Sequence, residues 1–189
     1  MGRAGDRYEM PEGAGTYLLT RPTADTGGEL VEFELIFPKG CFAPPPHIHS
    51  DQVEEYEVIE GVFDVIVDGE RRSLSPGESA SVPSHAVHTF ANPSGPVRVR
   101  NVHRPALGFE DFIERMYGVS QQRGIRSARS PRIRIYLSML WRDYPDTLIA
   151  ARARDRIAMA LAARVGGLLG LAKHLPPKVG GEPDRQAKK

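Results

Sequence analysis

The sequence predicts a mainly β fold, an antiparallel barrel or sandwich, followed by an α-helical extension. Three observations support this prediction: short alternating apolar and polar segments recur up to Pro105, turn residues separate them, and the periodicity becomes helical beyond that residue. We therefore expect an N-terminal arm over 1–28, a β-barrel over 29–105, and a basic helical extension with a disordered tail over 106–189.

The strand pattern is clearest after Leu30, where four apolar residues alternate with polar ones at period two. These four residues are Val31, Phe33, Leu35 and Phe37. Further short runs of this kind lie at about 53–59, 62–67, 80–82, 86–91 and 97–103. Asp68-Gly69 between two runs predicts a hairpin, because both central positions of a type I′ turn need positive φ.

The extension shows helical spacing in three segments. Apolar residues recur at helical intervals from Phe109 to Met116, and Gly118 is expected to end this first helix. Ser130-Pro131 predicts the start of a second helix through an N-cap serine and a first-turn proline. A third helical segment is expected over about 146–173.

Charge is distributed unequally along the chain. Residues 1–120 carry 10 basic and 19 acidic side chains, whereas residues 121–189 carry 15 basic and 5 acidic ones. The basic segment is expected to pack on the acidic barrel, to make a weak contact with an anionic membrane surface, or to bind another macromolecule. No transmembrane span is expected, because the longest uncharged run near its end, Val165–Ala172, is far shorter than the roughly 20 residues that a bilayer requires.

Two features favour a cytoplasmic protein. The first fifteen residues contain no apolar stretch of the kind that a secretion signal requires. Cys41 is the single cysteine, so it cannot form an internal disulfide, which fits a reducing compartment.

Histidines and a glutamate are spaced as metal ligands within the strand-rich region. His47 and His49 are two apart, which places both imidazoles on one face of a strand. Glu54 follows after a turn, and His88 begins a later strand. Three imidazoles and one carboxylate suit iron, manganese, nickel, cobalt, copper or zinc, and suit calcium or magnesium poorly. The alternative is a hydrogen-bonded polar cluster without an ion.

Two motifs resemble those of the cupin superfamily, in particular its small single-domain members with a cupin type 2 conserved barrel. The first is Gly40-x6-His47-x-His49-x4-Glu54-x6-Gly61. The second is Gly77-x5-Pro83-x-His85-x2-His88-x3-Asn92. The resemblance covers about residues 30–105.

The resemblance implies a cupin jelly-roll β-barrel, with His47, His49, Glu54 and His88 at the metal-ligand positions of the family. It also implies one divalent transition metal, with iron, manganese or nickel favoured, and a homodimer. We expect a metal-dependent dioxygenase, an oxidoreductase, that acts on a small oxygen-rich molecule. The alternatives are a non-catalytic module that binds a metal or metabolite, and a redox-neutral isomerase or decarboxylase. We expect no sequence-specific binding of nucleic acid.

Further residues are candidates for the site around the ion. His85 stands where the family usually has glycine, so it is expected at positive φ, either as a proton-transfer group or as a plain turn residue. Tyr56 is a second candidate catalytic residue, because it shares a strand face with Glu54. The expected substrate pocket is formed by Phe33, Phe37, Phe90 and His103. The alternative for the three phenylalanines is that they are ordinary core residues.

Overall fold

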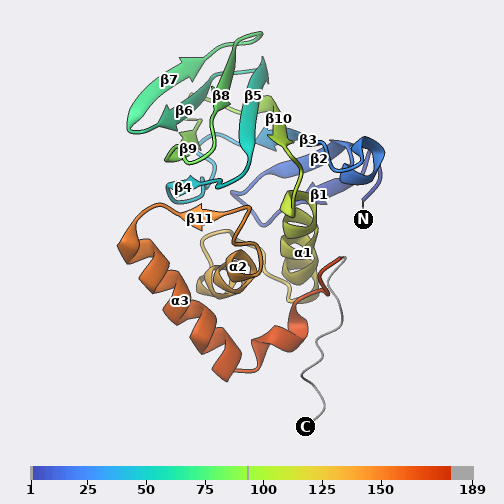
Figure 1. Ribbon diagram of the computed structural model, residues 1–189, viewed down its shortest axis with the longest axis vertical. Coiled ribbons are helices and arrows are strands. Elements are labelled where there is room, and N and C mark those ends of the chain that lie inside the picture. Colours follow the sequence, from blue (N-terminus) through green and yellow to red (C-terminus); the bar gives the residue numbers. More distant parts are fainter. Residues whose placement is uncertain (1, 93, 180–189) are drawn as a thin grey trace.

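A computed structural model describes residues 2–92 and 94–179 of the protein, so most of the predicted tail lies outside the described residues. The described strands form two antiparallel sheets that face each other (Figure 1). In order across the first sheet, the strands are β1 (Arg7–Glu9), β2 (Thr16–Arg21), β3 (Val31–Phe37), β10 (Val97–Arg104), β5 (Val53–Glu60) and β8 (Ser79–Val82). In order across the second sheet, they are β11 (Ile149–Ala150), β4 (His47–Ile48), β9 (His88–Ala91), β6 (Phe63–Val67) and β7 (Glu70–Leu74).

Alternation along the strands separates the core from the surface, as the sequence predicts. The apolar residues of β3 are almost completely buried, with Val31 and Phe33 at 0% exposure. On the other face of the first sheet, Arg100 lies 2.7 Å from Glu32 in an ion pair. The predicted hairpin joins β6 to β7, with φ of 50° at Asp68 and 88° at Gly69.

The segment expected as an N-terminal arm contributes β1 and β2, which extend the first sheet beyond β3. Neither strand was among the segments predicted from the sequence. The alternation in Thr16–Arg21 is weak, because partly buried residues occupy both faces of the strand. Leu19, which is fully buried, is the main core residue of β2.

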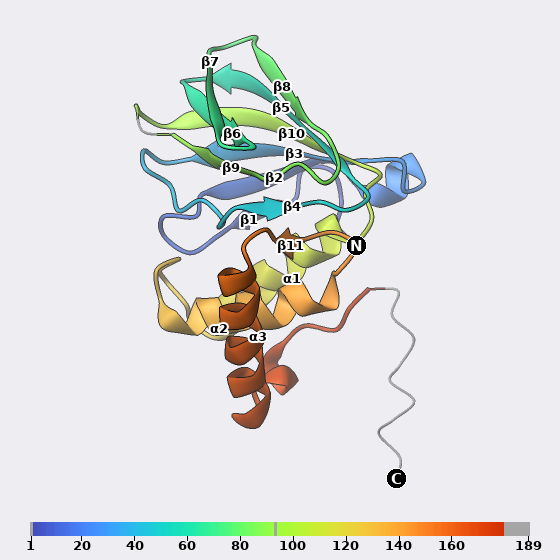
Figure 2. The same ribbon diagram turned by 60° about the vertical axis from the view of Figure 1, so that its left-hand side comes forward.

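The helices of the extension lie together on one side of the barrel (Figures 1 and 2). They are α1 (Phe109–Gln122), α2 (Pro131–Asp143) and α3 (Ala153–Leu168), followed by a short 3₁₀ helix at Leu171–His174. A second 3₁₀ helix, Thr23–Thr26, lies between β2 and β3. The predicted N-cap is present, because the Ser130 side chain accepts a hydrogen bond from the Arg132 N–H. Helix α1 continues four residues past Gly118, where the sequence placed its end. No helix in the described ranges is long and apolar enough to cross a bilayer.

The prediction of one helical segment over 146–173 is wrong at its start. Ile149 and Ala150 form β11, which pairs antiparallel with β4 at the edge of the second sheet, and α3 begins only at Ala153. Helix α3 packs mainly on α2, and Gly166 permits this contact. A β-carbon at Gly166 would lie 2.8 Å from Ile135 Cγ2 and would also meet the Met139 sulfur.

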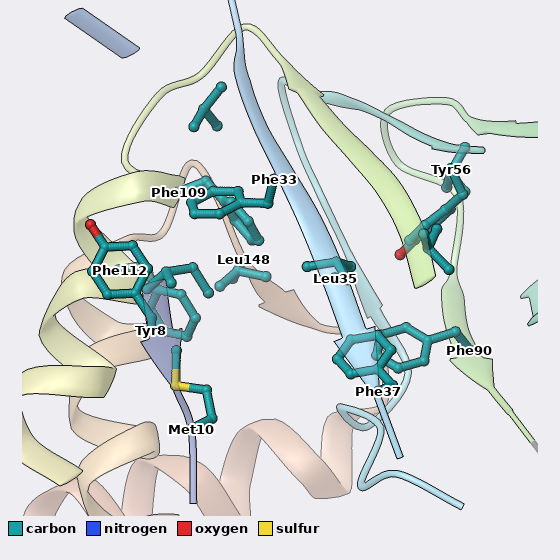
Figure 3. Packing of buried hydrophobic residues seen from close by; sticks show 14 of the residues in the cluster. Tyr8, Met10, Phe33, Leu35, Phe37, Tyr56, Phe90, Phe109, Phe112 and Leu148 are labelled. Carbon is teal, nitrogen blue, oxygen red and sulfur yellow. The ribbon is translucent and has the colours of Figure 1, made fainter. Parts of the chain in front are cut away.

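One hydrophobic core continues from the barrel into the helices (Figure 3). Phe33 of β3 makes an edge-to-face contact with Phe109 of α1, with ring centroids 6.0 Å apart. Phe37, at the other end of β3, stacks on Phe90. The extension is therefore packed against the barrel by buried aromatic contacts, and β11 places it beside β4 (Figure 2).

Candidate metal centre

The two sheets bring four predicted ligands together at the end of the barrel that faces the helices. β4 carries His47, His49 follows directly after it, and β9 carries His88 in register with His47. Glu54 comes from β5 of the opposite sheet. One ligand atom from each residue lies within 4.8 Å of every other, and all four side chains are buried.

The hydrogen bonds of the imidazoles fix which nitrogen faces the centre. Nδ1 of His47 lies 3.1 Å from the Pro45 carbonyl oxygen, and Nδ1 of His88 lies 3.1 Å from that of Ala86. A carbonyl oxygen only accepts, so each Nδ1 carries the proton and donates it. The neutral ring then has its lone pair on Nε2.

His49 shows the same arrangement with a partner from the extension. Its Nδ1–H donates to the carbonyl oxygen of Thr147, a residue 98 positions further along the chain. Thr147 directly precedes the segment that enters β11, and the Ala151 N–H donates to the Pro46 carbonyl at 2.9 Å. The extension therefore orients one of the predicted ligands.

The two carboxylate oxygens of Glu54 have different roles: Oε1 is fixed by residues of β10, and Oε2 faces the histidines. Asn101 of β10 donates to Oε1 at 2.9 Å. His103, which lies opposite Glu54 in the register of β10 and β5, places Nε2 3.3 Å from the same oxygen and 3.1 Å from Asn101 Oδ1. Oε2 is left to face Nε2 of His88 at 2.9 Å and Nε2 of His49 at 3.3 Å.

These contacts test whether the residues fit a metal ion. Nε2 of His88 is buried and has no hydrogen-bond partner with suitable geometry among the described residues, although Glu54 Oε2 is close. An imidazole lone pair that faces a carboxylate repels it unless a proton or a metal cation lies between them. The geometry therefore fits a cation held by three Nε2 atoms and one carboxylate oxygen, and this nitrogen and oxygen set suits a first-row transition ion.

Burial and mutual contacts shift the pKa values of this cluster. Burial, reinforced by the neighbouring His88 and His49, holds the pKa of His47 well below its usual value. Burial alone would raise the pKa of Glu54, but the surrounding histidines, first of all His103, outweigh it and hold the pKa well below its usual value. In the metal-free protein these contacts favour an ionised Glu54 and a neutral His47, whereas hydrogen bonding and charge attraction to Glu54 outweigh burial and raise the pKa of His88. A metal ion bound at this point would displace the proton from His88, because an imidazole binds a metal in its deprotonated form.

The other predicted site residues occupy different positions. His85 has φ of 66°, as expected for a histidine at a glycine position, and its side chain is exposed. Its backbone N–H donates to the His49 carbonyl, so its position supports the turn beside the ligands. Tyr56 is buried and lines the cavity next to Glu54, and burial and that carboxylate raise its pKa well above its usual value.

Of the predicted pocket residues, Phe90 lines the cavity beside the centre. Phe33 and Phe37 are core residues that support its wall through ring contacts. His103 is fully buried, and its ring stacks on Phe109 with centroids 3.5 Å apart, so it lies behind the cavity wall.

Sequence reasoning missed two groups at the centre. Asn101 could have been found from the sequence, because it shares a strand face with His103. A buried amide needs a hydrogen-bond partner, and Glu54 was the acidic residue available on that side of the sheet. Thr147 gave none, because it acts through a backbone carbonyl that every residue has. Trp141 of α2 also lies near the ligands, with its ring 6.0 Å from that of His47.

Comparisons with known proteins agree with this geometry. Residues 33–103 match the family model described as a cupin domain. The barrel is a cupin domain. The matched segment of the cupin domain runs from β3 to β10 and contains all four predicted ligands.

Individual relatives match only part of the chain. A probable oxidoreductase of Penicillium expansum, patJ, is 43% identical over 54 residues, which are 28% of this chain and 16% of that protein. KdgF from a Halomonas species is 26% identical, covers 50% of this chain and 81% of its own, and gives a TM-score of 0.44. An RmlC-like cupin from Shewanella frigidimarina is 26% identical, covers 56% of this chain and 88% of its own, and gives a TM-score of 0.47.

Proposed function

We propose that the protein is a metal-dependent cupin enzyme, with oxygenation of a small molecule as its reaction. One observation carries the proposal: three buried imidazoles donate Nδ1–H to backbone carbonyls and leave Nε2, together with Glu54, directed at one point beside a cavity. The name of the Penicillium relative as a probable oxidoreductase is consistent with redox chemistry.

His47, His49, Glu54 and His88 would hold one divalent ion, with iron, manganese or nickel favoured and zinc, cobalt or copper as alternatives. Such an ion supplies Lewis acidity toward an enolate or phenolate oxygen and, when it is redox-active, one-electron chemistry with dioxygen. The chain itself supplies a fixed ligand set, because Asn101 and the backbone carbonyls orient the carboxylate and the rings.

The residues beside the ligands control protons and water. Tyr56 keeps its phenolic proton at neutral pH, as any tyrosine of ordinary pKa does, and burial and Glu54 raise its pKa further. It can therefore donate a hydrogen bond to a bound oxygen atom but does not serve as a base. The aromatic side chains of Phe90 and Trp141 exclude water from the neighbouring volume, which strengthens electrostatic interactions there.

The test is oxygen uptake by protein loaded in turn with iron(II), manganese(II) or nickel(II). Catechols, flavonoids and 1,3-diketones serve as the substrate library, and the expected result is oxygen consumption that matches substrate loss. The double variant His47→Ala/His88→Ala is the control and should consume none. Turnover without oxygen would favour a redox-neutral isomerase or decarboxylase, and tight binding without turnover would favour a non-catalytic binding module.

The homodimer and the cytoplasmic location stay predictions. The apolar faces of α1 and α2 could pack on the protein's own barrel or on that of a second copy, and they are largely buried within the chain. An apolar surface that a second copy could contact is an exposed row on α3 and its C-cap, formed by Ile157, Leu161, Val165, Leu168 and Leu169. Light scattering at micromolar concentration tests the dimer, and Leu161→Gln/Leu168→Gln should weaken it.

Alternatively, the exposed apolar row on α3 makes the weak contact with an anionic membrane surface. Arg154 and Arg164 of α3 supply the basic side chains that such a contact requires. Sedimentation with anionic vesicles at low and high salt tests it. Co-sedimentation that salt abolishes, and that is lost in Leu161→Gln/Leu168→Gln, would support the membrane contact over the dimer.

A further inference from the structure

The cavity beside the metal centre extends out of the barrel and in between the helices. At one end it is lined by His47, Glu54 and Tyr56. At the other end it is lined by α2 and by residues of α3 such as Met159. Its volume of about 600 Å³ lies within the range of small-molecule pockets.

The wall beyond the ligands is mostly apolar. The side chains that the extension contributes include Phe109, Phe112, Ile133, Leu137, Trp141 and Met159. Leu137 and Met159 are only partly buried although they pack against the core, which fits side chains that border an open volume. Rings and thioethers of this kind bind apolar matter without directional hydrogen bonds.

Two polar groups in the wall are already engaged within the protein. Asn101 donates to Glu54, and the Ser138 hydroxyl donates to the Arg134 carbonyl at 2.7 Å. Arg134 and Asp155, on α2 and α3, retain contact with solvent. Away from Arg134 and Asp155, the hydroxyl groups of a bound sugar or polyol would find few free partners, and each hydroxyl buried without a partner is costly.

We infer that the ligand of this site is an amphiphilic small molecule, with one oxygen-bearing head for the ion and an apolar body. The body packs between α1, α2 and α3, and Leu137, Trp141 and Met159 determine which bodies fit. The inference rests on the proposed metal centre. It narrows the substrate class from oxygen-rich molecules in general to molecules with a single polar end.

Linear alkyl hydroxamates test the inference by binding alone. Their head chelates a metal ion through two oxygens, and their tail can be lengthened one carbon at a time. Calorimetric titration of zinc-loaded full-length protein should show affinity that rises with each methylene, by at most about fourfold. Octanohydroxamate should bind at least about 100-fold more tightly than acetohydroxamate.

Variants locate the tail. Leu137→Gln and Met159→Gln keep side-chain size but place an amide in the wall, so each should weaken octanohydroxamate binding by about tenfold and leave acetohydroxamate binding unchanged. Leu161→Gln, on the exposed outer side of α3, is the matched control and should change neither. Thermal unfolding checks that each variant is folded, and the chain-length series on the unaltered protein needs no variant.

The outcomes separate this inference from the proposed function. If no hydroxamate binds, long or short, the metal centre is wrong and the inference fails with it. If acetohydroxamate binds but longer tails add nothing, the metal centre stands and the apolar substrate class is overturned. The apolar substrate class is also overturned, and the metal centre also stands, if a polyhydroxylated hydroxamate such as gluconohydroxamate binds as tightly as octanohydroxamate.

Discussion

The barrel and the helical extension contribute to the same centre in different ways. The barrel supplies ligand side chains at short, regular spacing along the chain, with His47 and His88 in register on neighbouring strands. The extension supplies a backbone carbonyl to His49 and an apolar wall opposite the ligands. The difference shows that a ligand motif can be local in sequence while the groups that orient it and shape its pocket come from distant segments.

The largest expected effect comes from removing ligands of the barrel. The variant His47→Ala/His88→Ala should lower metal content from close to one ion per chain to almost none, because the two remaining ligands cannot complete the coordination shell. Metal content after purification without added metal measures this. His85→Gly is the matched control, since His85 belongs to the same motif but is exposed and glycine adopts its φ of 66° freely, and it should retain the ion. Full occupancy in the double variant would show that the ligand assignment is wrong.

A smaller effect should follow from disturbing what the extension contributes. Ala151→Pro removes the N–H that donates to the Pro46 carbonyl and so loosens β11 beside β4. The Thr147 carbonyl should then hold His49 less firmly, and metal affinity should fall by about 10- to 100-fold, the usual effect of losing a group that orients a ligand. Competition with a chromophoric chelator measures the affinity.

Ala153→Pro is the control for this change. It introduces the same residue two positions later, at the first position of α3, where proline is tolerated and Arg152 before it is already extended. Its metal affinity should equal that of the unaltered protein. Equal affinity in both proline variants would mean that the extension does not orient His49.

The packing of the extension on itself can be tested by two neighbouring glycines. Gly166→Ala places a methyl group against Ile135 and Met139 and should cost about 1–3 kcal/mol of unfolding free energy. Gly167→Ala meets no atom within 4 Å and should stabilise α3 by about 0.5–1 kcal/mol. Urea unfolding measures both. If Gly166→Ala were as stable as Gly167→Ala, α3 would not pack on α2 as described.

The smallest expected effect is a pH dependence in the barrel. The pKa of Glu54 in the folded protein lies below its usual value of 4.5, so its ionised form stabilises the metal-free fold above that pH, and this contribution is lost as pH falls. The difference in unfolding free energy between the metal-free unaltered protein and Glu54→Gln should therefore be larger at pH 7 than at pH 4. A larger difference at pH 4 would contradict the described contacts of Glu54.

The barrel was largely predictable from the sequence, and the role of the extension was not. Period-two alternation marks β3, and the Asp68-Gly69 turn marks the hairpin, because both reflect local steric and burial preferences. The positive φ of His85 followed from its place in the motif. In contrast, β11 has two residues, too few for any periodicity, and its pairing with β4 depends on packing across about a hundred residues of chain.

The most direct test of the metal centre is the protonation state of its imidazoles. Nuclear magnetic resonance of the ¹⁵N-histidine-labelled, zinc-loaded protein reports for each ring which nitrogen carries the proton and which binds the ion. His47, His49 and His88 should show protonated Nδ1 and metal-bound Nε2, whereas the resonances of exposed His85 should not respond to zinc. Nε2 protons on these three rings in the presence of zinc, or spectra that zinc leaves unchanged, would contradict the assignment.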